Sequence, residues 1–279
     1  MARGITGLER HRSGAANGKE PATSAGNGRR AVDMLDRFLE FSVHTPDVLD
    51  SLGFYKSLGF AEQEIGDVWS HKYAVVSDGC ISIGLHEDLQ ESPALTFVQP
   101  DLAKHARAMS DHGFEFSFLN IGSEEFNRLG FRDRYKNAIQ IIEARTFSLP
   151  DEDTRDSVCG SWFEIVLPAA DTMRSGHFWA PLAPKLLHLR EEPTTHMRFD
   201  AGNASLGISE SIALNSPSLC FKCQDKSALA SLIELHGFKH KLYPGFEGAF
   251  VQLVAPEGTS LYVFDEDYLG ESYVVDESD

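Results

Sequence analysis

The sequence repeats itself at a spacing of 124 residues, and this repeat constrains the fold more than any other feature of the chain. The matching pairs are Glu40 and Glu164, Asp47 and Asp171, Phe54 and Phe178, Leu58 and Leu182, 92–93 and 216–217, and 112–114 and 236–238. At a spacing of 123, Gly79, Ser82, Gly84 and Glu87 match Gly202, Ser205, Gly207 and Glu210. A register this constant along half of the chain indicates a tandem duplication.

Each copy is predicted to begin with a strand and a helix. Residues 38–44 alternate with period two, which is typical of a strand with one apolar face. The segment Thr45-Pro46-Asp47 then supplies an N-cap, a proline at the first helical position and an acid in the first turn. Apolar residues at i, i+1, i+4 and i+7 over 48–55 predict the buried stripe of a helix.

Further strands follow in each copy. In the first copy they are expected at 80–85, 94–98 and 138–143, with a second helix that ends at Gly113. In the second copy the corresponding runs include 205–208 and 260–264. The pattern predicts an α+β fold.

Module boundaries follow from composition. Residues 1–32 are rich in Gly, Ala, Ser, Asn and Arg without apolar periodicity, which predicts a disordered N-terminal tail. Module 1 is expected over 33–148, an acidic linker over 149–160, module 2 over 161–266 and an acidic C-terminal tail over 267–279. Met34, directly before the first strand, is a candidate for the true start.

Charge and cysteine content exclude several classes of function. The formal net charge is −17 at pH 7, which argues against nucleic acid as a partner. No apolar run is long enough to span a bilayer, and no signal-peptide pattern opens the chain. Cys220 and Cys223 lie at i and i+3 of a strand-like run, so they should point to opposite faces and not form a redox or zinc pair. Free thiols in a cytoplasmic protein are expected.

The two equivalent first strands each carry a carboxylate in the middle. Strand parity puts three apolar residues of each strand on one face: Leu39, Phe41 and Val43, then Phe163, Ile165 and Leu167. The opposite face carries Glu40, Ser42 and His44 in the first copy and Glu164 in the second. A buried carboxylate is costly without a partner, so both glutamates are candidate functional residues. Four small residues on the inward face leave room for a cavity: Ser82, Gly84, Ser205 and Gly207.

Two motifs resemble the vicinal oxygen chelate superfamily, which includes glyoxalase I, bleomycin-resistance proteins and extradiol dioxygenases. They are Phe-Tyr-Lys-Ser-Leu-Gly-Phe at 54–60, after a strand and Pro-Asp, and the closing turn Ala-Pro-Glu-Gly at 255–258. The resemblance covers residues 34–266. It implies two tandem βαβββ modules that form a curved mixed sheet around a central pocket. It does not select one activity, because the scaffold hosts both metal enzymes and metal-free binders.

The resemblance also implies where a metal site would be. In the superfamily's metal enzymes, ligands come from the middle of each module's first strand and from its last strand. The corresponding residues here are Glu40, Gln140, Glu164 and Tyr262. Iron, nickel or zinc sites normally include histidine, whereas carboxylates and an amide suit magnesium or manganese. We therefore expect no cofactor, with a divalent metal as the alternative.

A structural interpretation of the same residues remains open. Glu40 and Glu164 would then be buried acids that hydrogen-bond Gln140 and Tyr262 across a cavity. If the two carboxylates face each other, repulsion raises the pKa of at least one of them. His44 shares the predicted face of Glu40 and is a candidate ligand-binding residue, although packing in the core is the commoner role of such a histidine.

The sequence favours a small-molecule-binding protein of the glyoxalase and bleomycin-resistance type, without a typical metal site. The alternative is a metal-dependent glyoxalase- or dioxygenase-like enzyme with a Glu/Gln/Glu ligand set. A protein-interaction scaffold is the third hypothesis, and the small residues on the inward face favour a pocket over it. The expected ligand is cationic or aromatic, catalytic residues are not assigned, and the oligomeric state stays open.

Overall fold

A computed structural model describes residues 34–35, 37–64, 71–122, 126–144, 157–183, 185–191, 194–211, 213–244 and 248–266. Both predicted tails and most of the predicted linker lie outside the described residues. The chain from Ala31 to Asp279 forms one compact unit. In the part of the chain that is described, no helix combines the length and apolar character needed to cross a membrane.

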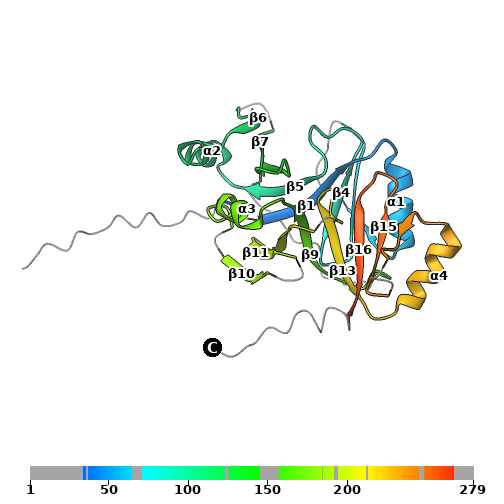
Figure 1. The fold of residues 1–279 in the computed structure, drawn as a ribbon. Helices are drawn as coiled ribbons and strands as arrows, with labels where there is room; N and C mark the ends of the chain where they lie inside the picture. The colour runs from blue at the N-terminus through cyan, green and yellow to red at the C-terminus, as the bar shows by residue number, and fades with distance from the viewer. Residues whose placement is uncertain are drawn as a thin grey trace, which may run out of the picture. The chain divides into compact units, whose positions relative to one another are not determined.

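The first repeat forms one mixed sheet of eight strands with two helices (Figure 1). Its elements are β1 (Arg37–His44), α1 (Val48–Ser57), β2 (Ala61–Gln63), β3 (Tyr73–Ser77), β4 (Ser82–His86), β5 (Ala94–Gln99), α2 (Leu102–Asp111), β6 (Phe116–Asn120), β7 (Arg128–Arg132) and β8 (Ala138–Glu143). The strand order is β2-β3-β4-β1-β5-β8-β7-β6.

The second repeat forms an equivalent sheet. Its elements are β9 (Ser161–Pro168), α3 (Thr172–Trp179), β10 (Lys185–Arg190), β11 (His196–Ala201), β12 (Ala204–Ser209), β13 (Ser218–Cys223), α4 (Lys226–His236), β14 (His240–Lys241), β15 (Phe250–Val254) and β16 (Ser260–Asp265). The order β10-β11-β12-β9-β13-β16-β15-β14 reproduces that of the first sheet. The α+β fold with two tandem modules is confirmed, and each module contains the βαβββ unit twice.

The helix that follows β1 begins two residues later than the sequence predicts. Asp47 is the N-cap of α1, and its side chain accepts hydrogen bonds from the backbone N–H groups of Leu49 and Asp50. Thr45 was expected to be the cap, but its hydroxyl instead contacts Ser51 Oγ at 2.9 Å. Pro46 therefore precedes the cap. Asp47 and Asp171 are the equivalent N-cap residues of the first helix in each repeat.

A β-bulge changes which residues of the two first strands reach the core. The register between β1 and β5 shifts between Phe38 and Glu40, which turns Phe38 into the core and leaves Leu39 half-buried. The register between β9 and β13 shifts in the same way. The prediction that Leu39 and Phe163 share the apolar face of their strands with Phe41 and Ile165 was therefore wrong, because strict alternation fails at a bulge.

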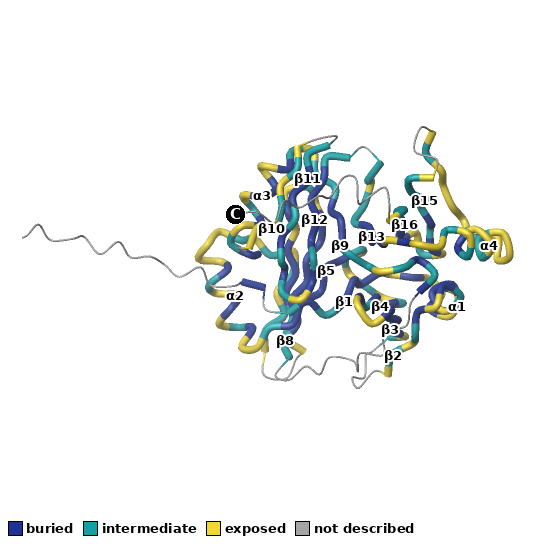
Figure 2. Tube along the Cα trace, turned by 90° about the horizontal axis from the view of Figure 1, so that it is seen from below, coloured by how far each residue is buried: buried dark blue, intermediate teal, exposed yellow. Residues whose placement is uncertain are grey.

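The two sheets share one apolar core. Its buried residues come from the helix-packed faces of both repeats, among them Phe41, Phe97 and Ile139 of the first and Ile165, Phe221 and Leu261 of the second. Ring contacts join the repeats, with Phe54 and Phe238 at 4.9 Å between centroids and Phe114 and Phe178 at 5.5 Å. Figure 2 shows the buried residues concentrated in the central strands, whereas α4 is largely exposed.

Candidate functional site

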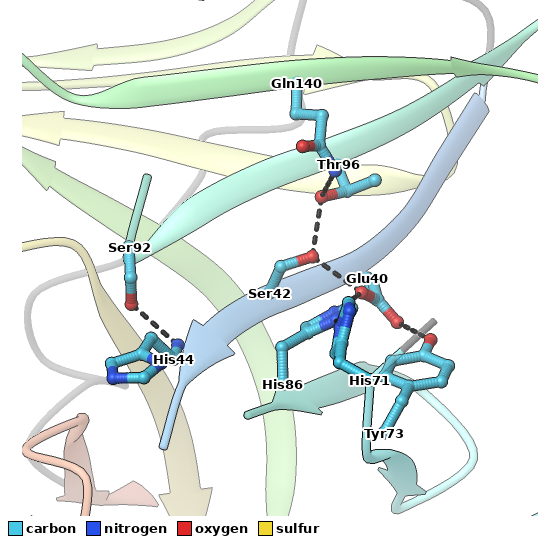
Figure 3. Close-up of polar contacts among 9 residues, drawn as sticks. All are labelled: Glu40, Ser42, His44, His71, Tyr73, His86, Ser92, Thr96 and Gln140. Atoms are coloured by element: carbon cyan, nitrogen blue, oxygen red, sulfur yellow. Dashed lines mark hydrogen bonds and ion pairs between the residues drawn. The ribbon is translucent and has the colours of Figure 1, made fainter. Parts of the chain in front are cut away.

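Glu40 lies at the centre of a buried polar network on the face of the first sheet that is opposite to the shared core (Figure 3). Its Oε1 accepts hydrogen bonds from Ser42 Oγ at 2.6 Å and from His86 Nε2 at 2.8 Å. Its Oε2 accepts a hydrogen bond from the Tyr73 hydroxyl. Three strands therefore supply the donors to one carboxylate, since Ser42 follows on β1, Tyr73 opens β3 and His86 ends β4.

These donors keep Glu40 ionised. Burial raises the pKa of the Glu40 carboxyl, but the hydrogen bond and charge of His86, together with the hydroxyl donors, outweigh it and lower the pKa below its ordinary value. An ionised carboxylate can only accept hydrogen bonds. The orientation of every hydroxyl and ring N–H that contacts Glu40 is thereby fixed.

The network extends from Glu40 in two directions. On one side Ser42 Oγ lies 2.6 Å from Thr96 Oγ1, which in turn accepts from Gln140 Nε2 at 3.5 Å. On the other side His86 Nδ1 lies 3.1 Å from His71 Nε2 (Figure 3). His86 is fully buried and His71 is half-buried, so the network runs from a buried position on the sheet to one that solvent reaches in part.

Glu164 occupies the equivalent position in the second sheet, where a histidine and an arginine contact it. Its Oε2 lies 3.1 Å from His196 Nε2 and 3.1 Å from Arg198 Nε. Burial raises the pKa of the Glu164 carboxyl, but the charges and hydrogen bonds of His196 and Arg198 lower it further than burial raises it. The register places Tyr73 and His196 at equivalent positions of β3 and β11, each opposite the last residue of the next strand.

Two glycines make room for these carboxylates. A Cβ atom on Gly84 would overlap the carboxylate of Glu40, and one on Gly207 would lie 2.6 Å from Glu164 Oε2. The small residues at these two positions were expected to leave room for a cavity. The structure fills that room with the glutamate side chains.

The predicted site residues occupy aligned positions on the three central strands of each sheet. Glu40 pairs with Thr96, and Thr96 pairs with Gln140. In the second sheet Glu164 pairs with Cys220, which pairs with Tyr262. The structure thus brings Glu40 near Gln140 through Ser42 and Thr96, although the two side chains make no direct hydrogen bond among the contacts of the described residues.

Tyr262 and His44 lie apart from the carboxylates. The Tyr262 hydroxyl donates to the carbonyl of Ala213 at 2.8 Å, and its ring packs near Phe250. His44 is exposed at the end of β1, where its backbone N–H donates to Ser92 Oγ at 2.8 Å. Figure 3 shows its ring pointing away from Glu40.

The two glutamates do not form a facing acid pair. Each carboxylate is bound by side chains of its own sheet, and each lies opposite the shared core. The pKa of both carboxyls is lowered, whereas mutual repulsion would raise one of them. The expectation of one cavity lined by both carboxylates was wrong, because strand parity and the shared core place the carboxylates on separate faces.

The donor sets fit a divalent metal poorly. The aligned residues of the first sheet are Glu40, Thr96 and Gln140, which offer a carboxylate, a hydroxyl and an amide. Those of the second sheet are Glu164, Cys220 and Tyr262, which offer a carboxylate, a buried thiol and a phenol. Burial raises the pKa of both the Cys220 thiol and the Tyr262 hydroxyl, which holds them protonated. Metal binding would also require breaking the bonds from His86 to Glu40 or from Arg198 to Glu164. Among the described residues no group of three His, Cys, Asp or Glu could hold a metal ion.

Sequence reasoning missed the partners of the glutamates: Tyr73, His86, His196, Arg198 and the middle positions Thr96 and Cys220. A signal for His86 was present, because it follows Ser82 and Gly84 on the same face of an alternating strand. Thr96 is aligned with Glu40 because β5 pairs with β1, and Cys220 is aligned with Glu164 because β13 pairs with β9. A local sequence pattern does not predict which strands pair.

The fold and the two buried glutamates define an α+β protein of tandem βαβββ modules, and solved structures share this architecture. A catechol 2,3-dioxygenase matches over 83% of this chain and 88% of its own, with 13% identity and a TM-score of 0.54. A halotolerant catechol dioxygenase matches over 84% of this chain and 88% of its own length, with 11% identity and a TM-score of 0.54. Homoprotocatechuate 2,3-dioxygenase from Arthrobacter globiformis matches over 83% of this chain and 80% of its own length, with 12% identity and a TM-score of 0.54.

These similarities show the fold. The chain has the vicinal oxygen chelate fold in the arrangement of the extradiol dioxygenases. No protein-family profile matches the sequence. No curated protein matches it by sequence either.

Proposed function

We propose that this protein binds a small organic molecule on the face of a sheet that carries a buried glutamate, without a metal of the dioxygenase type. The observation that carries the proposal is that donors of the chain itself bind both carboxylates. In each sheet a histidine side chain contacts the glutamate, and in the second sheet the charge of the glutamate is balanced by Arg198.

The face around Glu164 supports an aromatic ligand. A second apolar cluster lies there, built from buried Val166, Cys220 and Tyr262 and from the partly buried residues Phe163, Leu214, Tyr243, Phe250 and Phe264. The guanidinium of Arg198 lies 5.6 Å from the ring centroid of Phe163. Partly buried aromatic rings beside a fixed cation are suited to a flat molecule.

The proposal is tested with protein purified without chelator. We expect no stoichiometric divalent metal by elemental analysis, and we expect chelator to leave the thermal midpoint unchanged. A set of aromatic and cationic compounds should contain members that raise the midpoint, because a ligand that binds only the native state stabilises it.

The rival function is a metal-dependent dioxygenase- or glyoxalase-like enzyme, which the names of the structural neighbours suggest. It predicts a midpoint that falls with chelator and recovers with manganese or zinc. That result would refute the metal-free binding protein and support the enzyme.

A further inference from the structure

Strand β10 forms one edge of the second sheet, where it pairs with β11 (Figure 1). Within the described part of the chain, the strand order places no neighbour on its other side. An edge strand presents backbone N–H and C=O groups to which a further strand can bind. At six residues β10 is longer than the other edge strands of the two described sheets, because β2 has three residues, β6 has five and β14 has two.

Three leucines of β10 are exposed to solvent. The exposed fractions are 49% for Leu186, 45% for Leu187 and 40% for Leu189. Native proteins usually keep edge strands short or charged, since a long apolar edge favours pairing with another chain. The equivalent edge strand of the first sheet, β2, is both short and charged, because its middle residue is the exposed Glu62. The leucines are therefore a feature of the second repeat and not a requirement of the fold.

The leucines of β10 lie on the core side of the sheet. Residues that are directly opposite each other in adjacent strands share a face. Leu186 is opposite Phe199 and Leu189 is opposite Met197, and both partners belong to the shared core. The register shifts by one residue between Leu186 and His188, so a bulge separates the two ends of the strand.

The other face of β10 is basic. It carries Lys185, His188 and Arg190, which are opposite Asp200, Arg198 and His196. The side chain of Lys185 lies 3.7 Å from Asp200 but stays 70% exposed, and such a pair contributes little to stability. The strand itself contains no acid, although the chain has a formal net charge of −17, and the next acid, Glu191, follows the strand.

We propose that β10 is a docking edge for an extended segment of another protein in which apolar and acidic residues alternate. The segment adds one strand to the second sheet beside β10. Its apolar side chains cover Leu186 and Leu189, and its carboxylates face Lys185 and Arg190. A strand presents alternate side chains on opposite faces, so one such segment matches both faces of β10. The inference concerns the edge of the sheet and does not depend on ligand binding to its face.

A second copy of this chain fits the edge less well. Two copies of β10 that pair antiparallel about a twofold axis bring their basic faces to the same side of the joined sheet. Lys185 of one copy then approaches Arg190 of the other, and like charges in opposite positions destabilise a strand pair. An acidic partner strand replaces this repulsion by attraction.

The test uses a fluorescent peptide of the length of β10, in which glutamate and leucine alternate, titrated with the full chain at low ionic strength. Fluorescence anisotropy should show saturable binding. Lys185→Glu should weaken binding about tenfold and should instead favour a peptide of alternating lysine and leucine. Lys241→Glu is the matched control, since Lys241 is an exposed lysine on β14, the other edge strand of the same sheet.

A second pair of variants tests the apolar face. Leu189→Asp should also weaken binding of the peptide about tenfold, because it puts a charge opposite the leucines of the partner strand. Leu242→Asp is its control, since Leu242 is 56% exposed and directly follows β14. Circular dichroism and thermal melts check that all four variants are folded. The same affinity in Lys185→Glu and Lys241→Glu would overturn the docking edge, as would a peptide that does not bind.

Methylation of the peptide backbone separates strand pairing from attraction between charges. Alternate N–H groups of a strand point to opposite edges, so two peptides are compared, each methylated on the nitrogens of one edge. One of them should lose binding about tenfold and the other should bind like the unmodified peptide. Two methylated peptides that bind alike would overturn the pairing through one edge. Self-association of the full chain that the peptide abolishes would overturn the assignment to another protein, because a second copy would then occupy β10.

Discussion

At the scale of single residues, ionisation of the buried glutamates is linked to folding. The pKa of Glu164 is lower in the folded chain than its ordinary value, because His196 and Arg198 outweigh burial. The stability that this carboxylate contributes is therefore present above its unfolded pKa and is lost as the pH falls through the folded pKa. The same sign holds for Glu40.

Glu164→Gln should therefore destabilise the protein at neutral pH. The change leaves the Arg198 guanidinium without its counter-charge and the buried His196 without its carboxylate partner, which costs about 3–5 kcal/mol. Thermal melts from pH 7 to pH 3 should show the difference between wild type and variant shrinking in the acid range. A variant that melts at or above the wild type at pH 7 would restore the interpretation of two repelling carboxylates.

Gly84→Ala should destabilise the protein by about 3 kcal/mol, because its Cβ would overlap the Glu40 carboxylate. Gly53→Ala is the matched control, since Gly53 lies inside α1 and a Cβ there meets no atom within 4 Å. Alanine is the better helix former by about 1 kcal/mol, so the control should be neutral or stabilising. Urea denaturation measures both, and equal effects would disprove the fit between Gly84 and Glu40.

At the scale of elements, the sequence predicted strands better than it predicted their pairing. Alternation in 38–44 correctly put Glu40 opposite Phe41, because side-chain direction is a local property of a strand. The bulge beside Phe38 was not predicted, since it depends on the partner strand β5. Cys220 and Cys223 do reach opposite faces of β13, one in each apolar cluster, as the spacing predicted.

The site was predicted in part for the same reason. The positions of Glu40, Gln140 and Glu164 on the central strands could be derived from the repeat and the resemblance. The identity of their partners could not, because His86 and Arg198 reach the carboxylates from neighbouring strands whose register only the folded sheet defines.

Helix α1 makes a contact with the other repeat that gives a test at this scale. Glu257, in the turn before β16, accepts hydrogen bonds from Ser51 Oγ at 2.8 Å and from the hydroxyl of fully buried Tyr55 at 2.7 Å. Glu257→Ala should cost about 2–3 kcal/mol, because it leaves a buried hydroxyl unsatisfied. The exposed Glu234→Ala is the control.

A double-mutant cycle with Tyr55→Phe isolates the contact. The two changes should be less than additive in urea denaturation, since each removes the same hydrogen bond. Full additivity would show that Glu257 acts on stability independently of Tyr55.

At the scale of the whole molecule, neither repeat encloses its own core. The cluster that contains Phe41 and Phe97 also contains Phe221 and Leu261, and α1 and α4 lie on the same side of the molecule (Figure 1). Each sheet alone would expose the apolar face that the other covers.

The segment 33–148 expressed alone should therefore fail to fold cooperatively. We expect it to bind the dye 1-anilinonaphthalene-8-sulfonate and to lack a sharp thermal transition, in contrast to the full chain. A soluble segment with a sharp transition would show that module 1 is stable without the second repeat.

The shared core turns the two carboxylate-bearing faces away from each other, and the contacts of Glu40 and Glu164 have no residue in common. A change on one face therefore needs no compensating change on the other. The duplication has left two faces that can change independently, and they differ already, because β4 ends in His86 beside Glu40 whereas β12 ends in Ser209.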